Sequence, residues 1–139
     1  MSAVKQQPVF TPKTNFPLVV NLPKIYPEPF TFHMRVQLVA DAFEAQKNFI
    51  GLPDTDKQGE AFHQYDAEMI SILSTKAPEG FPDFPAFDKT SNLSEKDWLR
   101  TTLREYFLPT DPERREGFRF ICRRAMAMYW EAIQPEQYL

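Results

Sequence analysis

The sequence predicts a mainly α domain of the α+β class: a small four-helix domain with an N-terminal β-hairpin and an extended Pro-rich arm. Two observations predict it. Apolar residues recur at helical spacing from residue 37 onward, and a period-2 apolar pattern bounded by prolines precedes them. A chain of 139 residues is expected to form one domain. We therefore expect an arm at residues 1–16 and a single helical domain at 17–139.

The hairpin is expected at residues 17–36. The stretch "PLVVNL" at 17–22 is apolar and bounded by prolines, and "FTFHMRV" at 30–36 places alternate residues on one face. The connector "PKIYPEP" holds three prolines, which suit turns and edge strands. Because an isolated hairpin is only marginally stable in water, we expect this one to pack on helices or to pair with another chain.

Two helices are expected next, at residues 37–50 and 57–75, separated by the helix-breaking "GLPDTDKQG". In the second helix, apolar residues recur at helical intervals while the acidic residues lie elsewhere, which predicts an apolar inner side and an acidic outer side. The predicted inner residues are Phe62, Tyr65, Met69, Ile72 and Leu73, and the predicted outer residues are Glu60, Asp66 and Glu68.

The last two helices carry start signals. Ser94 is a good N-cap for a helix at 94–107, and Asp111 followed by Pro112 is a strong one for a helix at 112–133. The fourth helix has an apolar stripe formed by Phe118, Ile121, Cys122, Ala125, Met128, Tyr129 and Ala132. Between the second and third helices lies a loop at 77–92, whose phenylalanines are expected to pack over the core: Phe81, Phe84 and Phe87.

Composition excludes several classes of protein. The net charge is -3 and the pI is about 5.4, which argues against general binding to nucleic acid. The single cysteine allows no internal disulfide and indicates a reducing compartment. The N-terminus has no apolar signal region, and no apolar run approaches the roughly 18 residues that would span a membrane. We expect a cytoplasmic protein, in the host cytoplasm if a phage encodes it.

No pattern predicts catalysis, a cofactor or a metal site. The two histidines, His33 and His63, match no zinc spacing, and we interpret them as hydrogen-bonded or exposed histidines. Cys122 could be a nucleophile, but it lies within the apolar stripe of the fourth helix, so core packing is the better interpretation. The acidic residues have no telling spacing, and four glycines leave little room for a phosphate-binding loop.

One face of the fourth helix is a candidate protein-binding surface. A helical wheel places arginines together with a tryptophan about a quarter turn from the apolar stripe, and such a group can bind by charge and by stacking. The candidate residues are Arg115, Arg119, Phe120, Arg123 and Trp130. The alternative is a solvated arginine face with Trp130 packed on the hairpin or on the Phe-rich loop. If the face binds, the acidic chain as a whole favours a protein partner over nucleic acid.

The segment "LVVNLPKIYPEPFTFHMRVQLVADAFEA" resembles the tail assembly chaperones of long-tailed bacteriophages, in which an apolar strand, a proline-containing turn, an F-x-F strand and a helix come in this order. The resemblance covers about residues 9–50, less than a third of the chain, and His33 stands where a basic residue is usual in that family. The matching residues are Leu18, Val19, Val20, Pro23, Phe30, Phe32, Met34, Arg35, Phe43 and Glu44.

The resemblance implies a non-enzymatic protein that binds a tape measure protein during tail assembly and associates with itself. Under this hypothesis the hairpin makes the contact between subunits, through Leu18, Val20, Phe30 and Phe32. Two alternatives stay open. One is a small structural or adaptor subunit of a virion particle, and the other is a phage-encoded inhibitor or regulator that binds a host protein.

Overall fold

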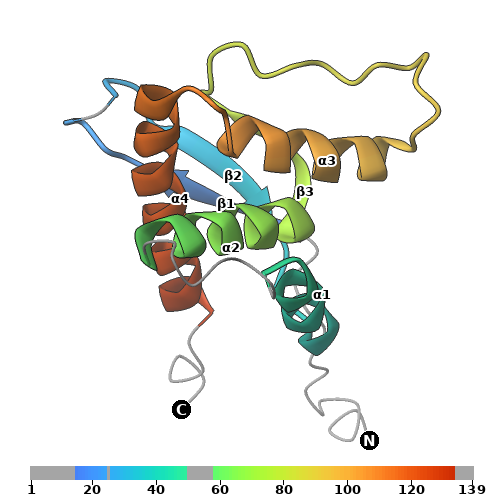
Figure 1. Cartoon of the computed structure of the whole chain (residues 1–139), viewed down its shortest axis with the longest axis horizontal. Coiled ribbons are helices and arrows are strands. Elements are labelled where there is room, and N and C mark those ends of the chain that lie inside the picture. The colour runs from blue at the N-terminus through green and yellow to red at the C-terminus, as the bar shows by residue number, and fades with distance from the viewer. Residues whose placement is uncertain (1–14, 25, 50–57, 134–139) are drawn as a thin grey trace, which may run out of the picture.

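The computed structural model describes residues 15–24, 26–49 and 58–133 (Figure 1). These residues form an α+β fold with four helices and a three-stranded antiparallel sheet. The predicted class and its four helices are confirmed, but the strands make a sheet and not a hairpin only. The predicted arm falls mostly on residues 1–14, which lie outside the described residues.

The sheet has the strand order β1-β2-β3, so β2 is its central strand. β1 spans Phe16–Val20, β2 spans Phe30–Met34 and β3 spans Ser74–Glu79. β1 and β2 pair in an antiparallel register that sets Leu18 opposite Phe32, and β2 pairs with β3 through a register shift near His33. The alternation in "FTFHM" and the apolar "LVV" therefore predict the first two strands, although both end before their predicted limits.

The third strand contradicts the prediction, which placed residues 74–75 in a helix and 77–79 in a loop. β3 has the sequence "STKAPE", and only Pro78 in it is buried. An edge strand that is exposed on both faces shows no apolar alternation, and a proline argues against a strand in any sequence reading. The pairing with β2 therefore stabilises a segment whose local sequence carries no strand signal.

The helices lie close to their predicted positions. α1 spans Val39–Phe49, α2 spans Gln58–Leu73, α3 spans Glu95–Phe107 and α4 spans Pro112–Ala132. Both predicted N-caps are confirmed, since Ser94 accepts a hydrogen bond from the backbone of Asp97 at 3.1 Å and Asp111 accepts one from the backbone of Arg114 at 3.0 Å. These caps satisfy N–H groups that a helix start leaves without intrahelical acceptors.

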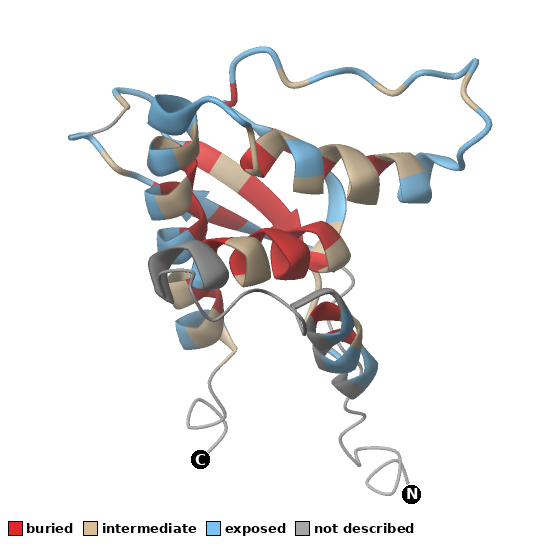
Figure 2. Cartoon of the chain, viewed as in Figure 1, coloured by how far each residue is buried: buried red, intermediate tan, exposed pale blue. Residues whose placement is uncertain are grey.

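The sheet lies behind α2 in Figure 1, with α4 along β1 and α3 near β3. Figure 2 shows that burial concentrates where β2 and α2 face each other, while the outer sides of α3 and α4 are exposed. One cluster of buried side chains joins all these elements, from Leu18 in β1 to Tyr129 in α4. The core therefore lies between the sheet and three of the helices.

Phe81 lies at the centre of the aromatic part of this core. Its ring stacks on Phe30 at 4.3 Å and meets Phe107 edge-on at 5.2 Å between ring centroids. Further along the loop, Phe84 contacts Tyr106 and Phe87 contacts Trp98. The prediction that these phenylalanines pack over the core is confirmed for Phe81 and Phe84, whereas Phe87 packs on Trp98 at the edge of the core.

Gly80 makes this placement of Phe81 possible. Its φ is +92°, and a Cβ atom there would lie 2.5 Å from the carbonyl oxygen of Pro29. A side chain would be strained by the backbone angle and would clash with a backbone atom that cannot rotate away. The chain therefore leaves β3 and turns into the core at a position that only glycine fits.

The predicted inner side of α2 is confirmed for four of its five residues, which pack in or against the core: Tyr65, Met69, Ile72 and Leu73. Phe62, assigned to the inner side, is 47% exposed, whereas Asp66 is 2% exposed. Glu68 and His63 are also buried, so the prediction of an acidic outer side is wrong. The physical reason is the position of α2, which is buried on most sides between α1, α3 and α4 and takes several polar side chains into the interior.

Arg35 links β2 to the helices that surround it. Its guanidinium donates two hydrogen bonds to Asp41 in α1, at 2.7 and 2.9 Å. Its backbone N–H donates to the carbonyl of Leu73 at the end of α2, and its own carbonyl accepts the hydroxyl of Tyr129 in α4 at 2.9 Å. One residue after the central strand thus connects three helices.

Candidate protein-binding surface

α4 has a buried side and an outer side, and the candidate residues lie on the outer side and its flanks. Phe118, Cys122 and Tyr129 are buried, while Phe120 is 49% exposed. The predicted apolar stripe is confirmed for most of its members, although Ala132 is exposed, Met128 is only half-buried and Met126, not assigned to the stripe, is buried. The helix therefore presents Phe120 and its neighbouring arginines away from the core.

Arg123 faces α2. Its guanidinium lies 3.2 Å from Asp66 and over the ring of Phe62, 5.6 Å from the ring centroid. The side chain of Arg123 is 50% exposed, whereas that of Asp66 is 2% exposed. Arg123 thus pairs with a carboxylate inside the domain and still reaches solvent.

The carboxyl group of Asp66 is unusual in its environment. Burial raises its pKa to about 7, against the opposing effect of the nearby Arg123 charge. Its Oδ2 atom is buried and has no hydrogen-bond partner among the described residues. A carboxylate in such a place is costly when charged, because desolvation penalises the ionised form.

Arg119 lies one turn before Arg123 on the same flank of α4. It forms an ion pair with Glu116, and its guanidinium lies 4.9 Å from the ring centroid of Phe120. We define the aromatic–arginine surface as Phe62, Arg119, Phe120 and Arg123. It joins two half-exposed phenyl rings, each with a guanidinium over it, across α2 and α4.

Two candidate residues from the sequence lie apart from this surface. Arg115 donates a hydrogen bond to the carbonyl of Pro109 at 3.0 Å and so helps to join α3 to α4. Trp130 is partly buried, and its ring meets that of Tyr129 edge-on at 5.2 Å. Among the described residues, Arg119 and Arg123 cover the rings of Phe120 and Phe62, and the ring contact of Trp130 is to its own helix and not to the hairpin or the Phe-rich loop, where the alternative placed it.

The four residues predicted for self-association are core residues. Phe30, Phe32 and Val20 are fully buried and Leu18 is nearly so, all within the cluster between the sheet and the helices. Their side chains cannot contact another subunit in this conformation. The alternation of the strands identified the buried face correctly, but that face packs against this chain's own helices.

A groove of about 600 Å³ lies apart from this surface, between β3, the loop before α3 and the start of α3. Phe87 and Trp98 line it together with Lys76, Lys96 and Glu95. The charges in this groove are mixed, and the groove could not be predicted from the sequence because β3, which forms one of its sides, was not predicted.

The residues that could carry metal or nucleophile chemistry lie apart or are buried. His33 pairs with Glu79 at 2.6 Å, and His63 is buried in α2, so the interpretation of His63 as an exposed residue is wrong. Burial raises the pKa of the Cys122 thiol well above its usual range, which disfavours a thiolate, and its predicted place in the core is confirmed. Within the described ranges, no three His, Cys, Asp or Glu side chains are grouped to hold a metal ion.

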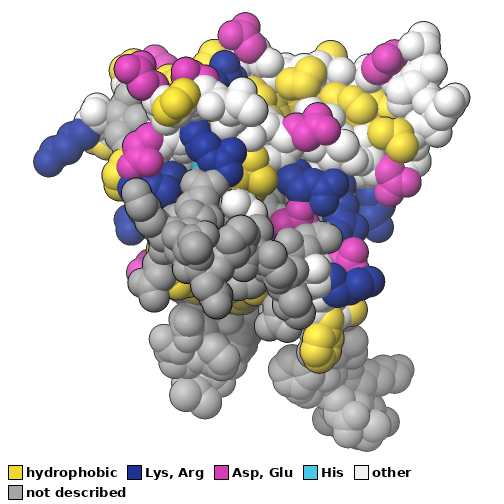
Figure 3. All heavy atoms as spheres, in the orientation of Figure 1, with side chains coloured by type: hydrophobic (Ala, Val, Ile, Leu, Met, Phe, Trp, Pro, Cys, Tyr) yellow, Lys and Arg dark blue, Asp and Glu magenta, His cyan; other side chains and the backbone are white. Residues whose placement is uncertain are grey.

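Figure 3 shows one face of the molecule, on which basic, acidic and hydrophobic side chains are interspersed over the described part. None of the helices in the described residues combines the length and the apolar character needed to cross a bilayer.

The sequence analysis placed two residues of α2 on the wrong side of the helix: Phe62 lies at the surface and Asp66 is buried. The buried positions His63, Asp66, Ala67 and Ile70 do follow helical spacing, but two of them are polar.

No family model, no curated protein and no solved structure matches this chain. The aromatic–arginine surface and the resemblance of the N-terminal segment are therefore the two indications of function.

Proposed function

We propose that this chain is a non-enzymatic protein-binding domain, which acts as a tail assembly chaperone for the tape measure protein of a long-tailed bacteriophage. The observation that carries the protein-binding part is the aromatic–arginine surface. Phe62 and Phe120 are each about half exposed beside a guanidinium group. Aromatic residues and arginine are enriched in the centres of protein interfaces, whereas solvated faces favour lysine and glutamate.

The chemistry of this surface suits an amphipathic helical segment that carries acidic residues. The phenyl rings would contact its apolar side, and the guanidinium groups would pair with its carboxylates. Arg123 has donors beyond its contact with Asp66, because a guanidinium carries five N–H groups. A tape measure protein is a long, helix-rich chain with an apolar side, which is the kind of partner that this surface fits.

The resemblance of residues 9–50 supports the more specific part of the proposal. In this segment the order of strand, proline-rich turn, F-x-F strand and helix is the order that the structure has in β1, β2 and α1. Co-purification from phage-infected cells tests this biological setting.

The experiment is a pull-down of the tagged chain from phage-infected cells, with the co-purified proteins identified by mass. The proposal expects one very long, helix-rich protein that binds this chain in the lysate, while this chain is missing from finished particles. Recovery of shell or tube proteins, with this chain present in the particle, would instead identify a structural subunit. Capture of a host factor would identify a regulator.

Surface variants connect the result to the aromatic–arginine surface. Phe62→Ser combined with Arg119→Glu should abolish capture, while Phe43→Ser is the matched control because Phe43 is 64% exposed on α1. Arg123 is left unchanged, since a glutamate there would face the buried Asp66 and destabilise the fold. Equal capture by both variants would show that the surface is not used.

A further inference from the structure

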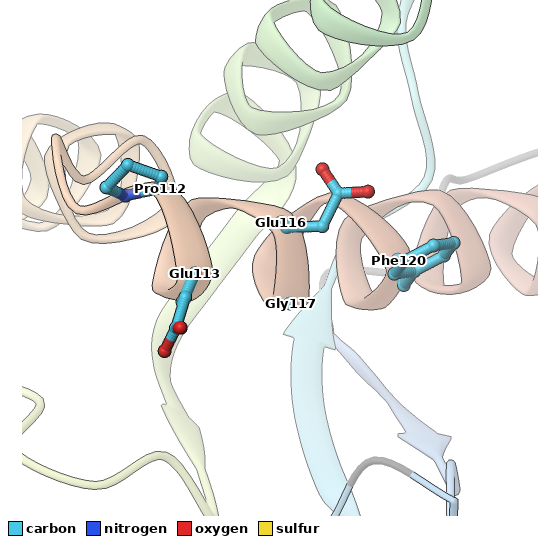
Figure 4. Close-up of a pocket in the computed structure, with 5 residues that line it drawn as sticks. All are labelled: Pro112, Glu113, Glu116, Gly117 and Phe120. Carbon is cyan, nitrogen blue, oxygen red and sulfur yellow. The ribbon is translucent and has the colours of Figure 1, made fainter.

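The outer side of α4 has a second feature beside the arginine flank, a shallow depression lined by Pro112, Glu113, Glu116, Gly117 and Phe120. Figure 4 shows Glu113 and Phe120 on either side of Gly117 along the helix. A Cβ atom added to Gly117 would have no heavy atom within 4 Å outside its own helix turn, so the depression is open. A hole and an exposed phenyl ring thus lie one turn apart on the same helix.

Nothing inside the domain requires the glycine. Gly117 is the sixth residue of a 21-residue helix, and a glycine in a helix interior costs about 1 kcal/mol relative to alanine. The φ of Gly117 is not in the left-handed region, unlike that of Gly80. Its missing side chain therefore leaves room for something outside the chain.

We propose that two copies of this chain associate through an antiparallel, two-fold pairing of their α4 helices, with Phe120 of each copy seated over Gly117 of the other. In a two-fold interface, each contact between two positions occurs twice, once in each direction. A helix that carries both a knob and a hole at neighbouring positions can therefore fill both holes at once. Small residues allow helices to approach closely at such a contact.

The charges on the same helix face specify this register. Residues 113, 117, 120 and 124 follow one another at spacings of four, three and four, so they share one side of the helix. The midpoint between Gly117 and Phe120 is also the midpoint between Glu113 and Arg124. When Phe120 meets Gly117 of the second copy, Glu113 therefore lies opposite Arg124 of that copy.

This complementarity favours a second copy over a different protein. Glu113 and Arg124 are both exposed, and neither forms an ion pair with another described residue. A parallel pair would set each charge against itself, which disfavours the parallel arrangement. The pairing shares Phe120 with the aromatic–arginine surface, but Arg119 and Arg123 lie on the flank of α4 that faces α2, so a dimer leaves Phe62, Arg119 and Arg123 for a partner.

The test is sedimentation velocity of the full chain over a wide range of concentrations. The wild type should show a monomer–dimer equilibrium. Glu113→Arg alone and Arg124→Glu alone should each weaken dimerisation tenfold or more, because each sets two pairs of like charges against each other. Glu105→Arg on α3 is the matched control, an exposed charge reversal outside the pairing.

The decisive measurement is the mixture of the two charge variants. In a heterodimer of Glu113→Arg with Arg124→Glu, both contacts again join opposite charges, so the mixture should form dimers at concentrations at which each variant alone is monomeric. The double variant should dimerise by itself for the same reason. Gly117→Leu should also abolish dimers while the helix remains folded by circular dichroism, since the added side chain points into open space.

Three results would overturn the proposal. They are a wild type that stays monomeric at the highest concentration, a Glu113→Arg variant that dimerises like the wild type, and a mixture of the two charge variants that stays monomeric. The proposed partner binding is judged separately, because its variants change Phe62 and Arg119 and leave the Gly117 contact intact.

Discussion

Asp66 in α2 and Arg123 in α4 lie 3.2 Å apart, yet the carboxyl group is almost completely buried and the guanidinium is half in solvent. The pair joins a helix of the core to the surface proposed to bind a partner. Because burial raises the pKa of Asp66 to about 7, the domain holds this carboxyl group more easily in its neutral form.

Asp66→Asn should therefore stabilise the fold at pH 8. The folded state binds the Asp66 proton more tightly than the unfolded state does, so the contribution of this group to stability falls as the pH rises from 3.8 to about 7. The gain is a few kcal/mol at most, about 1.4 kcal/mol for each pH unit of that interval. Urea unfolding at pH 8 and pH 4 measures it, and the variant should lose its advantage at pH 4. A less stable variant at pH 8 would mean that the attraction to Arg123 outweighs burial.

Asp41→Asn should show the opposite dependence on pH. The hydrogen bonds from Arg35 lower the pKa of Asp41, so its carboxylate stabilises the folded state above pH 3.8 and loses this effect as the pH falls through its folded pKa. We expect a loss of about 1–3 kcal/mol at neutral pH, because a charged hydrogen bond is removed. Urea unfolding at pH 7 and pH 3 should show the difference shrinking with acid. An equal loss at both values would contradict the role of the ionised pair.

Phe81→Ala should be among the most damaging substitutions in the loop before α3. The ring is 8% exposed and contacts aromatic side chains from β2, α3 and α4. Large-to-small changes at such a site cost about 3–5 kcal/mol. Phe87→Ala is the matched control, since Phe87 is only half-buried against Trp98 and should cost about 1 kcal/mol. Thermal unfolding compares the two, and equal losses would show that Phe81 is not the centre of the core.

Gly80 and Gly117 should respond to substitution by alanine in opposite directions. Gly80→Ala should destabilise the domain by more than 1 kcal/mol, because the positive φ and the Pro29 carbonyl both oppose a Cβ atom. Gly117→Ala should stabilise the monomer by about 1 kcal/mol, because the helix gains propensity and the new methyl group meets open space. Chemical unfolding at low protein concentration measures both, and a destabilised Gly117→Ala monomer would contradict the open depression.

The sequence predicted the elements whose signals are local. The N-cap residues Ser94 and Asp111 predicted the starts of two helices. The alternation of Phe30, Phe32 and Met34 predicted the central strand. β3 could not be predicted, because it owes its shape to pairing with β2. The burial of the acidic residues of α2 could not be predicted either. A helix surrounded by other elements buries Asp66 and Glu68, whereas a helix at the surface would expose them.

The candidate surface was predicted in part. Arg119, Phe120 and Arg123 are together on α4, as the helical wheel requires, whereas Phe62 comes from α2 and needs the tertiary structure to be found. Trp130 and Arg115 lie on the same side of the helical wheel as Arg119 and Arg123, but they make contacts inside the domain. A wheel identifies one side of a helix, and only the neighbouring helices decide which part of that side stays accessible.

The prolines in the sheet have a consequence for growth of the sheet. Both outer strands carry one, Pro17 in β1 and Pro78 in β3. A proline has no N–H to offer an incoming strand, so neither edge is a good template for another copy or for an unfolded segment. A domain rich in phenylalanine thereby has two sheet edges that disfavour fibril-like stacking, and both proposed contacts with other chains lie on its helices.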